Sequence, residues 1–211
     1  MKSVVVTGGT LRLGLAISAR LREDGWRVLT ASHRSDSGAD LVADLATPLG
    51  AAKLYADACA LLGGVPPDAL VNNAAIFSGD AAAIDMLNFE SPKKLTVMMA
   101  GREEGVGAVV NILDCRVLGD AAENDGPYCE SKRKLLDWTR KSAAMFCSNL
   151  RVNAVAPGPV MPSPAVKEPA GETPLGRPAP EDVAEAVAFL LSARRTSGCV
   201  VPVDGAQSLV S

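Results

Sequence analysis

Two residues of the chain, Tyr128 and Lys132, have the types and the spacing of a proton-transfer pair. An unperturbed tyrosine loses its proton near pH 10, so it is poorly matched to proton transfer at neutral pH. A lysine ammonium held close to the phenol favours the phenolate and lowers the tyrosine pKa. Residues four positions apart share one face of a helix, so we expect a helix to bring these two side chains together. The spacing alone is common by chance, and the surrounding motifs decide its meaning.

A glycine-containing turn lies near the N-terminus, where residues 7–14 read Thr-Gly-Gly-Thr-Leu-Arg-Leu-Gly. Glycine lets the backbone turn tightly and approach a pyrophosphate, whose charge the N-terminus of a helix favours. Arg12 occupies the place of a middle glycine. We therefore expect the phosphates of a dinucleotide here, and a purely structural turn is the alternative. The residues assigned to this contact are Gly8, Thr10, Arg12 and Leu13.

The second expected strand, residues 26–32, ends in a polar string that bears on the choice of cofactor. An acid at this strand end would bind the ribose of NAD, whereas an arginine accommodates the 2′-phosphate of NADP. Arg34 is that arginine, and His33 and Ser35 are assigned to the same contact, which favours NADPH. Asp44 lies where a side chain would reach the adenine amine. The alternatives are a solvated arginine in a turn and, for Asp44, the capping of a helix.

These motifs need a scaffold of alternating strands and helices, and the apolar pattern of the chain predicts one. Buried parallel strands are short β-branched runs, and amphipathic helices repeat apolar residues at helical spacing. The expected strands are residues 3–7, 26–32, 69–72, 108–113, 151–156 and 199–203. The expected helices are residues 11–24, 128–148 and 181–193. The alternation predicts a doubly wound α/β fold of the Rossmann type, with a parallel sheet and one domain over residues 1–211.

Two segments depart from the regular alternation. Arg34 and Asp44 lie ten positions apart, too close for a full crossover helix between parallel strands, so we expect an extended or single-turn connection there. Seven prolines between residues 159 and 180 cannot belong to a continuous helix and predict a loop.

Composition and charge exclude several classes of protein. A formal net charge of −3 disfavours a nucleic-acid partner or an anionic membrane surface. The chain has no apolar run of roughly 18 residues and no signal-peptide pattern, which predicts a cytoplasmic protein without a membrane partner. Five scattered cysteines indicate free thiols rather than disulfides or a metal site. The single histidine, His33, lies in a polar turn, which argues against a hydrolytic triad.

Taken in chain order, the motifs resemble those of the short-chain dehydrogenase/reductase family over nearly the whole length. The resemblance rests on the glycine turn, Asn72-Asn73-Ala74-Ala75, Tyr128-x-x-x-Lys132 and Pro157-Gly158. It implies a nicotinamide-dependent oxidoreductase in which Tyr128 delivers a proton and Lys132 holds the ribose. It also implies that Asn72 stiffens the central strand through backbone contacts, and that Asn88 links Lys132 to solvent through a proton relay. An asparagine on a helix surface is the alternative for Asn88.

The resemblance implies further cofactor contacts at the carboxyl ends of the strands. They are assigned to Asn72, Ala74, Pro157, Gly158, Val160 and Ser163. Family members often carry a threonine shortly after Pro-Gly to hold the nicotinamide carboxamide. Pro162 occupies that place here, so Ser163 is the expected substitute.

Within the family, the chain is similar to pteridine reductases and bacterial dihydromonapterin reductases. Asp114 stands three residues after Asn111, where most members carry a serine, and Phe77 follows Asn73 by four residues. The resemblance implies that Phe77 stacks a flat pterin against the nicotinamide and that Arg12 meets phosphate and substrate. Core packing is the alternative for Phe77, and a solvated loop acid is the alternative for Asp114.

The aspartate bears on the bond that is reduced. An ionised carboxylate would repel the oxyanion that develops when a ketone is reduced, whereas a C=N substrate develops basicity at nitrogen. We therefore expect Asp114 and Tyr128 to form an acid pair that supplies the proton, with NADPH reducing a C=N bond of a dihydropterin or related heterocycle. A ketone reductase of secondary metabolism and a non-catalytic dinucleotide-binding module are the alternatives. Apolar helix faces at residues 95–99 and 135–145, with the family habit, predict a homodimer or homotetramer.

Overall fold

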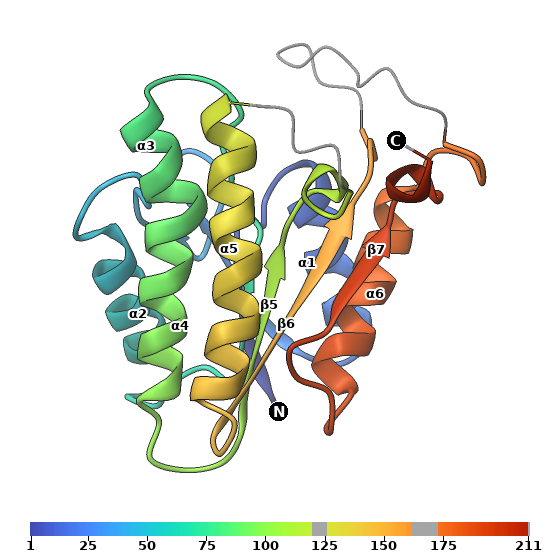
Figure 1. The fold of residues 1–211 in the computed structure, drawn as a ribbon. Helices are drawn as coiled ribbons and strands as arrows, with labels where there is room; N and C mark the ends of the chain where they lie inside the picture. Colours follow the sequence, from blue (N-terminus) through green and yellow to red (C-terminus); the bar gives the residue numbers. More distant parts are fainter. Residues whose placement is uncertain (120–125, 162–172, 211) are drawn as a thin grey trace.

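The computed structural model describes residues 1–119, 126–161 and 173–210, which form an α/β structure around a single sheet (Figure 1). All seven strands are parallel, and their order across the sheet is β3-β2-β1-β4-β5-β6-β7. The strands are β1 Ser3–Thr7, β2 Arg27–Ser32, β3 Leu41–Val42, β4 Ala69–Asn72, β5 Gly107–Ile112, β6 Leu150–Pro157 and β7 Val200–Val203. The predicted doubly wound fold is confirmed, and the six expected strands lie within two residues of their observed bounds.

The two-residue period of the strands divides the core between the two faces of the sheet. In β1, Val4 and Val6 pack into the cluster beneath α1 and α6, whereas Val5 packs into the cluster on the opposite face. Both faces of such a sheet are covered, which explains why β1 is apolar and buried throughout. The short β-branched runs therefore predict where the strands lie, but not toward which face of the sheet each side chain points.

Helices cover both faces of the sheet, with α1 and α6 on one side and α2, α4 and α5 on the other (Figure 1). Their bounds are α1 Arg12–Glu23, α2 Gly50–Leu61, α3 Ala81–Asp85, α4 Ser91–Ala100, α5 Gly126–Met145 and α6 Pro180–Ser192. A π-helix at Met86–Glu90 joins α3 to α4, and short 3-10 helices occur at Cys115–Val117 and Gln207–Leu209. The sequence did not predict α2, α3 or the two-residue strand β3, and of α4 it indicated only a helix face at residues 95–99.

The connection from β2 to β3 contains no helix, as its length predicted. Asp40 closes it, because its Oδ2 accepts hydrogen bonds from the backbone nitrogen and the hydroxyl of Thr30, at 2.8 and 2.7 Å. The proline-containing segment lies partly outside the described residues. Its described parts contain no helix before α6: residues 159–161 follow β6, and residues 173–179 are irregular, with a turn at residues 174–175.

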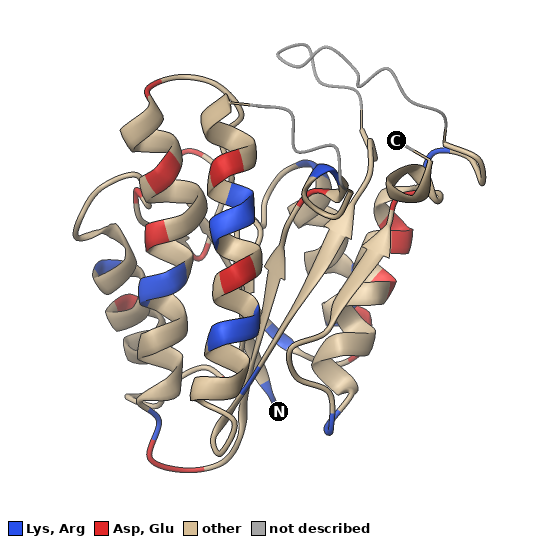
Figure 2. Ribbon diagram, in the orientation of Figure 1, with Lys and Arg blue, Asp and Glu red and all other residues tan. Residues whose placement is uncertain are grey.

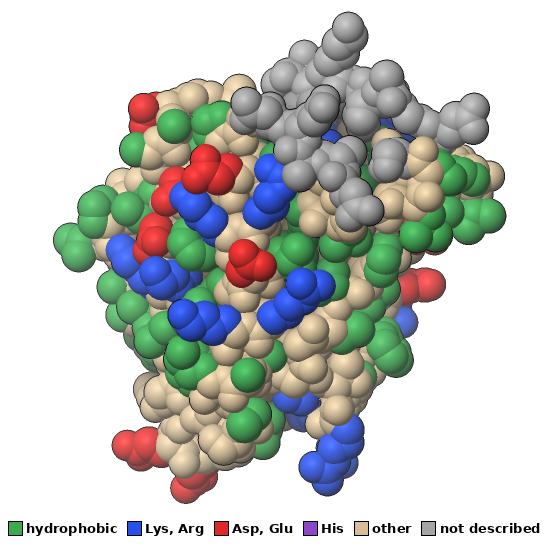
Figure 3. Space-filling model, in the orientation of Figure 1, with side chains coloured by type: hydrophobic (Ala, Val, Ile, Leu, Met, Phe, Trp, Pro, Cys, Tyr) green, Lys and Arg blue, Asp and Glu red, His purple; other side chains and the backbone are tan. Residues whose placement is uncertain are grey.

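Charged residues lie mainly on the helices, and the strands are nearly free of them (Figure 2). On the face formed by α4 and α5, basic, acidic and apolar side chains are interspersed (Figure 3). The apolar residues that suggested self-association belong largely to the hydrophobic core of this chain: Leu95, Met99 and Leu135 are buried. The oligomeric state stays a prediction without that support. Within the described part of the chain, no helix combines the length and apolar character needed to cross a membrane.

Candidate active site

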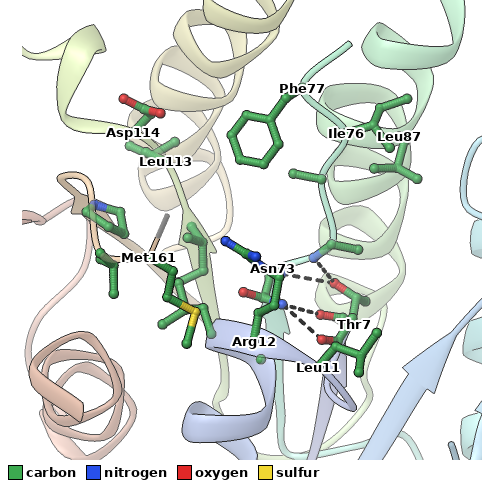
Figure 4. A pocket seen from close by; sticks show the side chains of 18 of the residues that line it. Thr7, Leu11, Arg12, Asn73, Ile76, Phe77, Leu87, Leu113, Asp114 and Met161 are labelled. Atoms are coloured by element: carbon green, nitrogen blue, oxygen red, sulfur yellow. Dashed lines mark hydrogen bonds between the residues drawn. The ribbon is translucent and has the colours of Figure 1, made fainter. Parts of the chain in front are cut away.

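A cavity of about 400 Å³ opens at the carboxyl ends of the strands. Its walls come from the β1–α1 turn and from the segments that follow β2, β4, β5 and β6. Strand order reverses between β1 and β4, so the cavity lies at the switch point where open parallel sheets bind ligands. Figure 4 shows Phe77 and Asp114 in one part of this cavity, with Arg12 and Leu11 in the part nearer to Thr7.

The glycine turn is built for close approach of the backbone. Gly8 has φ +63°, and a Cβ on Gly14 would lie 2.0 Å from the Gly8 carbonyl oxygen, so α1 and the turn pack together only without a side chain there. Helix α1 begins after Leu11 with no side-chain cap and no acidic residue in its first turn. Such an uncapped N-terminus beside a cavity suits the pyrophosphate of a dinucleotide. Thr10 and Leu13, both predicted contacts, line this part of the cavity.

Arg12 takes up a strained backbone conformation at this position. Its φ of +50° lies in the left-handed region that favours glycine, which explains why a glycine would be expected at this point of the motif. The residue lines the cavity between Leu11 and Asn73 (Figure 4). Strain of this kind, held at a ligand cavity, is consistent with a side chain retained for binding.

The end of β2 departs from the expectation for Arg34. His33 and Arg34 line the cavity, but the Arg34 guanidinium makes a bidentate pair with Asp36, with Nε–Oδ1 at 2.9 Å and an Nη–Oδ2 distance of 2.7 Å. An acid therefore does lie close to this strand end, two residues beyond the arginine. Ser35 is exposed and does not line the cavity.

Asp44 is also exposed, and it does not line the cavity, although its neighbours Ala43 and Leu45 do. Its Oδ1 accepts a hydrogen bond from the backbone nitrogen of Ala46 at 2.9 Å. It stabilises the turn ahead of α2 without being the N-cap, which is Leu49.

The two asparagines at the end of β4, Asn72 and Asn73, have different partners. Asn72 donates to the Asn111 side chain at 2.8 Å, so its described hydrogen bond is to a side chain and not to the backbone as expected. It is not among the residues that line the cavity, and its cofactor contact stays a prediction. Asn73 makes the backbone contacts instead: its Nδ2 donates to the carbonyl oxygens of Thr7 and Gly8 at 2.9 and 3.3 Å. Successive residues of a strand point to opposite faces, and the sequence alone did not say which of the pair faces the turn. Ala74 lines the cavity as predicted.

Asn88 lies in the π-helix and is 1% exposed, so the alternative of a surface asparagine is wrong. Its amide bonds both the backbone nitrogen and the carbonyl of Ile76 at 3.0 Å, and its Nδ2 also donates to the Ser131 hydroxyl at 3.1 Å. The described contacts therefore tie the segment after β4 to α5, without a direct bond to Lys132. A π-helical turn is a local widening that often occurs at functional sites.

Helix α5 brings Tyr128 and Lys132 together inside the cavity, and both are buried. Burial lowers the pKa of Lys132 to about 8, and its Nζ donates to the Ile112 carbonyl at 2.7 Å. Burial, and then the nearby carboxylate of Asp114, raise the pKa of Tyr128 well above its ordinary value. The net shift of the tyrosine pKa is therefore upward, opposite to the direction expected from Lys132. The phenol is held neutral, as a proton donor in a reduction must be.

Asp114 accepts a hydrogen bond from the Tyr128 hydroxyl at 3.1 Å, so it is not a solvated loop acid. Its carboxylate is also paired in a bidentate manner with Arg116, with both N–O distances at 3.0 Å. A carboxylate engaged in this way is an acceptor. The expectation that Asp114 supplies a proton together with Tyr128 is therefore corrected: within this pair the Tyr128 hydroxyl donates and the Asp114 carboxylate accepts.

The wall opposite Asp114 is aromatic. The Phe77 ring lies 4.6 Å from the Tyr128 ring, at an interplanar angle of 30°, and its side chain is 47% exposed, which excludes simple core packing. Leu87, Leu113 and Met161 add apolar surface around this space (Figure 4). A flat, partly apolar substrate fits a slot of this kind.

The remaining predicted residues lie at the end of β6. Pro157, Gly158 and Val160 line the cavity, and a Cβ on Gly158 would lie 2.8 Å from the Asp204 Cα. Ser163 lies outside the described residues. Sequence reasoning missed several lining residues: Asn73, Ile76, Leu87, Leu113, Cys115, Arg116, Met161 and Gln207. Two of them carried a sequence signal that could have been used: Asn73 belongs to the motif of residues 72–75, and Arg116 lies two residues from Asp114.

The comparisons with known proteins agree with this geometry. Residues 65–206 match the sequence model of the family described as Enoyl-(Acyl carrier protein) reductase. The granaticin polyketide synthase putative ketoacyl reductase 2 of Streptomyces violaceoruber is 32% identical, with 98% of this chain and 96% of that protein covered. Human dehydrogenase/reductase SDR family member 4 is 30% identical, with 74% of this chain and 65% of that protein covered.

Among solved structures, a FolM alternative dihydrofolate reductase 1 from Brucella canis, complexed with NADP, superposes with a TM-score of 0.86. It is 29% identical, and the match covers 100% of this chain and 95% of that one. Sequence family, fold and cavity thus agree, and the protein belongs to the short-chain dehydrogenase/reductase family as a nicotinamide-dependent oxidoreductase.

Proposed function

We propose that this protein uses NADPH to reduce a C=N bond in a dihydropterin or a related flat heterocycle, with Tyr128 as the proton donor. The observation that carries the proposal is the Asp114 carboxylate, 3.1 Å from the Tyr128 hydroxyl, in the position where most family members carry serine. The FolM structures from two Brucella species, both in complex with NADP and 29% identical over the whole chain, support the same substrate class.

The charges in the slot favour reduction at nitrogen over reduction at oxygen. A ketone would place a developing oxyanion beside the Asp114 carboxylate, which raises the energy of the transition state. A C=N bond instead becomes an N–H group once protonated, and a carboxylate accepts a hydrogen bond from N–H. Phe77 provides the face against which a flat ring can stack beside Tyr128.

Each of the cavity residues has a separate role in the proposed reaction. A dihydronicotinamide held in this cavity would supply the hydride to carbon. Tyr128 transfers its hydroxyl proton to the adjacent nitrogen, and Asp114 keeps that hydroxyl oriented within the slot. Lys132, buried on the same face of α5, provides an ammonium that would hold the ribose. The apolar walls exclude water from the reacting atoms.

The preference for NADPH rests on Arg34. Its guanidinium lies at the edge of the cavity near the end of β2, where a 2′-phosphate would be bound. The pair with Asp36 is exposed, and exposed ion pairs are weak, so a phosphate carrying more negative charge can displace the carboxylate.

A ketone reductase is the second candidate, because the curated relatives include a putative ketoacyl reductase. The experiment is a screen of NADPH oxidation at 340 nm with a dihydropterin, dihydrofolate and a set of activated ketones. We expect turnover of the dihydropterin or dihydrofolate to exceed that of every ketone. Turnover of ketones alone would overturn the C=N assignment, and no turnover with either set would favour a dinucleotide-binding module.

An Asp114→Ser variant separates the two substrate classes within one protein. Activity on the dihydropterin is expected to fall, because no carboxylate remains to orient Tyr128 and accept the new N–H. Reduction of an activated ketone is expected to be unchanged or faster, because a neutral hydroxyl faces the oxyanion. Equal effects on both substrates would contradict the role given to Asp114.

A further inference from the structure

The hydrogen bonds of Asp114 are dominated by one neighbour. Its Oδ1 accepts from the backbone nitrogen of Arg116 at 3.1 Å and from Arg116 Nε at 3.0 Å. Its Oδ2 accepts from an Arg116 Nη at 3.0 Å and from the Tyr128 hydroxyl at 3.1 Å. An ionised carboxylate has about four lone-pair positions. Arg116 thus fills three of them and leaves one, which the proposed proton donor occupies.

Arg116 also lies against the phenol itself. Its guanidinium carbon is 5.1 Å from the centroid of the Tyr128 ring, within the range of a cation–π contact. The Arg116 side chain is 30% exposed and that of Asp114 is 16% exposed, so water screens the group only partly. One arginine therefore contacts both the carboxylate and the ring that the carboxylate orients.

The charges around Tyr128 come from two elements. The segment after β5 contributes Asp114 and Arg116, and α5 contributes Lys132 and Cys129, while the segment after β4 contributes the uncharged ring of Phe77. Asp114 raises the pKa of Tyr128, and Arg116 lowers it. Burial lowers the pKa of Lys132 to about 8, whereas a guanidinium stays charged throughout the working range. Arg116 is the lasting positive charge beside the phenol.

We propose that Arg116 is a positioning residue of this reaction, which holds the Asp114 carboxylate against the Tyr128 hydroxyl and neutralises that carboxylate, so that the phenolate left after proton delivery does not face an unpaired negative charge. The inference rests on the proposed role of Tyr128 as donor. In the step concerned, the O–H bond of Tyr128 breaks and its proton forms the new N–H bond. The electron pair of that bond comes from the C=N bond, whose carbon has taken the hydride. The phenolate then regains a proton from solvent.

The reason for an arginine follows from the balance of charge. A phenolate next to an unpaired carboxylate would place two negative charges about 3 Å apart in a half-buried slot, which opposes proton delivery. With Arg116 present, the carboxylate and guanidinium together are neutral. The bidentate fork also fixes the carboxylate plane, which a lysine at this position would not do.

The test compares Arg116→Gln with Arg140→Gln, a control at an exposed arginine of α5. Single-turnover rates are measured with saturating NADPH and dihydropterin, and NADPH affinity is measured separately. Arg116→Gln is expected to lower the rate about tenfold or more with cofactor affinity unchanged, and Arg140→Gln to leave both unchanged. In an Asp114→Asn background the loss caused by Arg116→Gln should shrink to about threefold or less, because its main partner is gone. Equal losses in both backgrounds would overturn the proposal.

A second measurement reports on the phenol without turnover. Tyr128 is replaced by 3,5-difluorotyrosine, whose more acidic phenol titrates where the fold is intact, and ¹⁹F NMR follows its ionisation. The titration should move to higher pH in Arg116→Gln and to lower pH in Asp114→Asn. In Arg116→Lys, which keeps the charge, the midpoint of the titration should fall between those of wild type and Arg116→Gln. This variant replaces Arg116→Gln in the comparison if Arg116→Gln does not fold.

The two measurements separate failure of the inference from failure of the proposed function. A titration that Arg116→Gln leaves in place would overturn the inference even if Tyr128 proves essential. If Tyr128→Phe instead retained normal turnover, the proposed function would fail while the titration still reported the electrostatic link between Arg116 and the phenol.

Discussion

Lys132→Met is expected to make the ligand-free protein more stable at neutral pH, even though it removes a residue of the proposed active site. Lys132 is fully buried, and burial lowers its pKa from 10.5 to about 8. Such a fall corresponds to about 3 kcal/mol of unfavourable free energy while the ammonium is charged. Loss of the hydrogen bond to the Ile112 carbonyl returns about 1–2 kcal/mol, so the net gain at pH 7 is about 1–2 kcal/mol.

The sign of the pH dependence follows from proton binding. Between about pH 8 and pH 10.5 the unfolded chain holds the Lys132 proton and the folded protein does not, so wild-type stability rises with pH through this window. The methionine variant lacks this titration. Its advantage should therefore be full below pH 8, shrink above it, and reverse near pH 10.5, where only the lost hydrogen bond remains.

The assay is urea unfolding followed by circular dichroism at several pH values, always as the difference between wild type and variant, so that shared titrating groups cancel. Lys141→Met, at an exposed lysine of the same helix, is the matched control and should show no such window. A Lys132→Met protein that is less stable than wild type at pH 7, or a difference that does not change with pH, would refute the reasoning.

Three further predictions follow from particular contacts. Arg34→Ala should weaken NADPH binding about tenfold or more with little effect on NADH, whereas Asp36→Asn, which frees the guanidinium, should tighten NADPH binding about two- to fivefold. Titration of each variant with both cofactors checks this, and unchanged NADPH affinity in both variants would contradict it. Gly14→Ala should prevent normal cofactor binding and lower the melting temperature, because its Cβ would lie 2.0 Å from the Gly8 oxygen. A variant that binds the cofactor and melts like wild type would show that the turn is not packed as described. Arg151→Met should lower the free energy of unfolding in urea by about 2–4 kcal/mol, because this side chain donates to four backbone carbonyls at the end of α6, those of Leu190, Leu191, Ala193 and Thr196. A free energy of unfolding within about 0.5 kcal/mol of wild type would contradict that role.

The sheet could be predicted from sequence because its strands are buried on both faces. A run such as residues 3–7 contains almost only β-branched residues, and that pattern has few other structural meanings. Helix α2 gave a weaker signal, because its buried side is formed by Gly50, Ala51, Leu54 and Ala58, and three of these four are small. The π-helix at Met86–Glu90 depends on packing against neighbouring segments, which propensity does not describe.

The site was predicted well where a sequence motif determines the backbone conformation. It was predicted poorly where the ion-pair and hydrogen-bond partners of a side chain depend on the three-dimensional structure. The glycine turn, Tyr128 and Lys132 line one cavity, as their order in the chain predicted. The pairs of Arg34 with Asp36 and of Asp114 with Arg116 join residues two positions apart, the first in a turn and the second at the start of a short 3-10 helix. Whether such side chains meet depends on local backbone geometry, so neither pair was foreseen. The role of Asp114 changed as a result, and Arg34 gained a competing partner for the expected phosphate.

The measurement that tests the central claim most directly is the turnover of Tyr128→Phe with NADPH and the dihydropterin that wild type reduces. The substitution removes only the hydroxyl that bonds Asp114 and leaves the ring beside Phe77 in place. We expect kcat to fall about 10²–10⁴-fold, the range for loss of a general acid, while the NADPH dissociation constant stays within about twofold of wild type. A variant that binds NADPH and retains a near-normal kcat would contradict the assignment of Tyr128 as the proton donor.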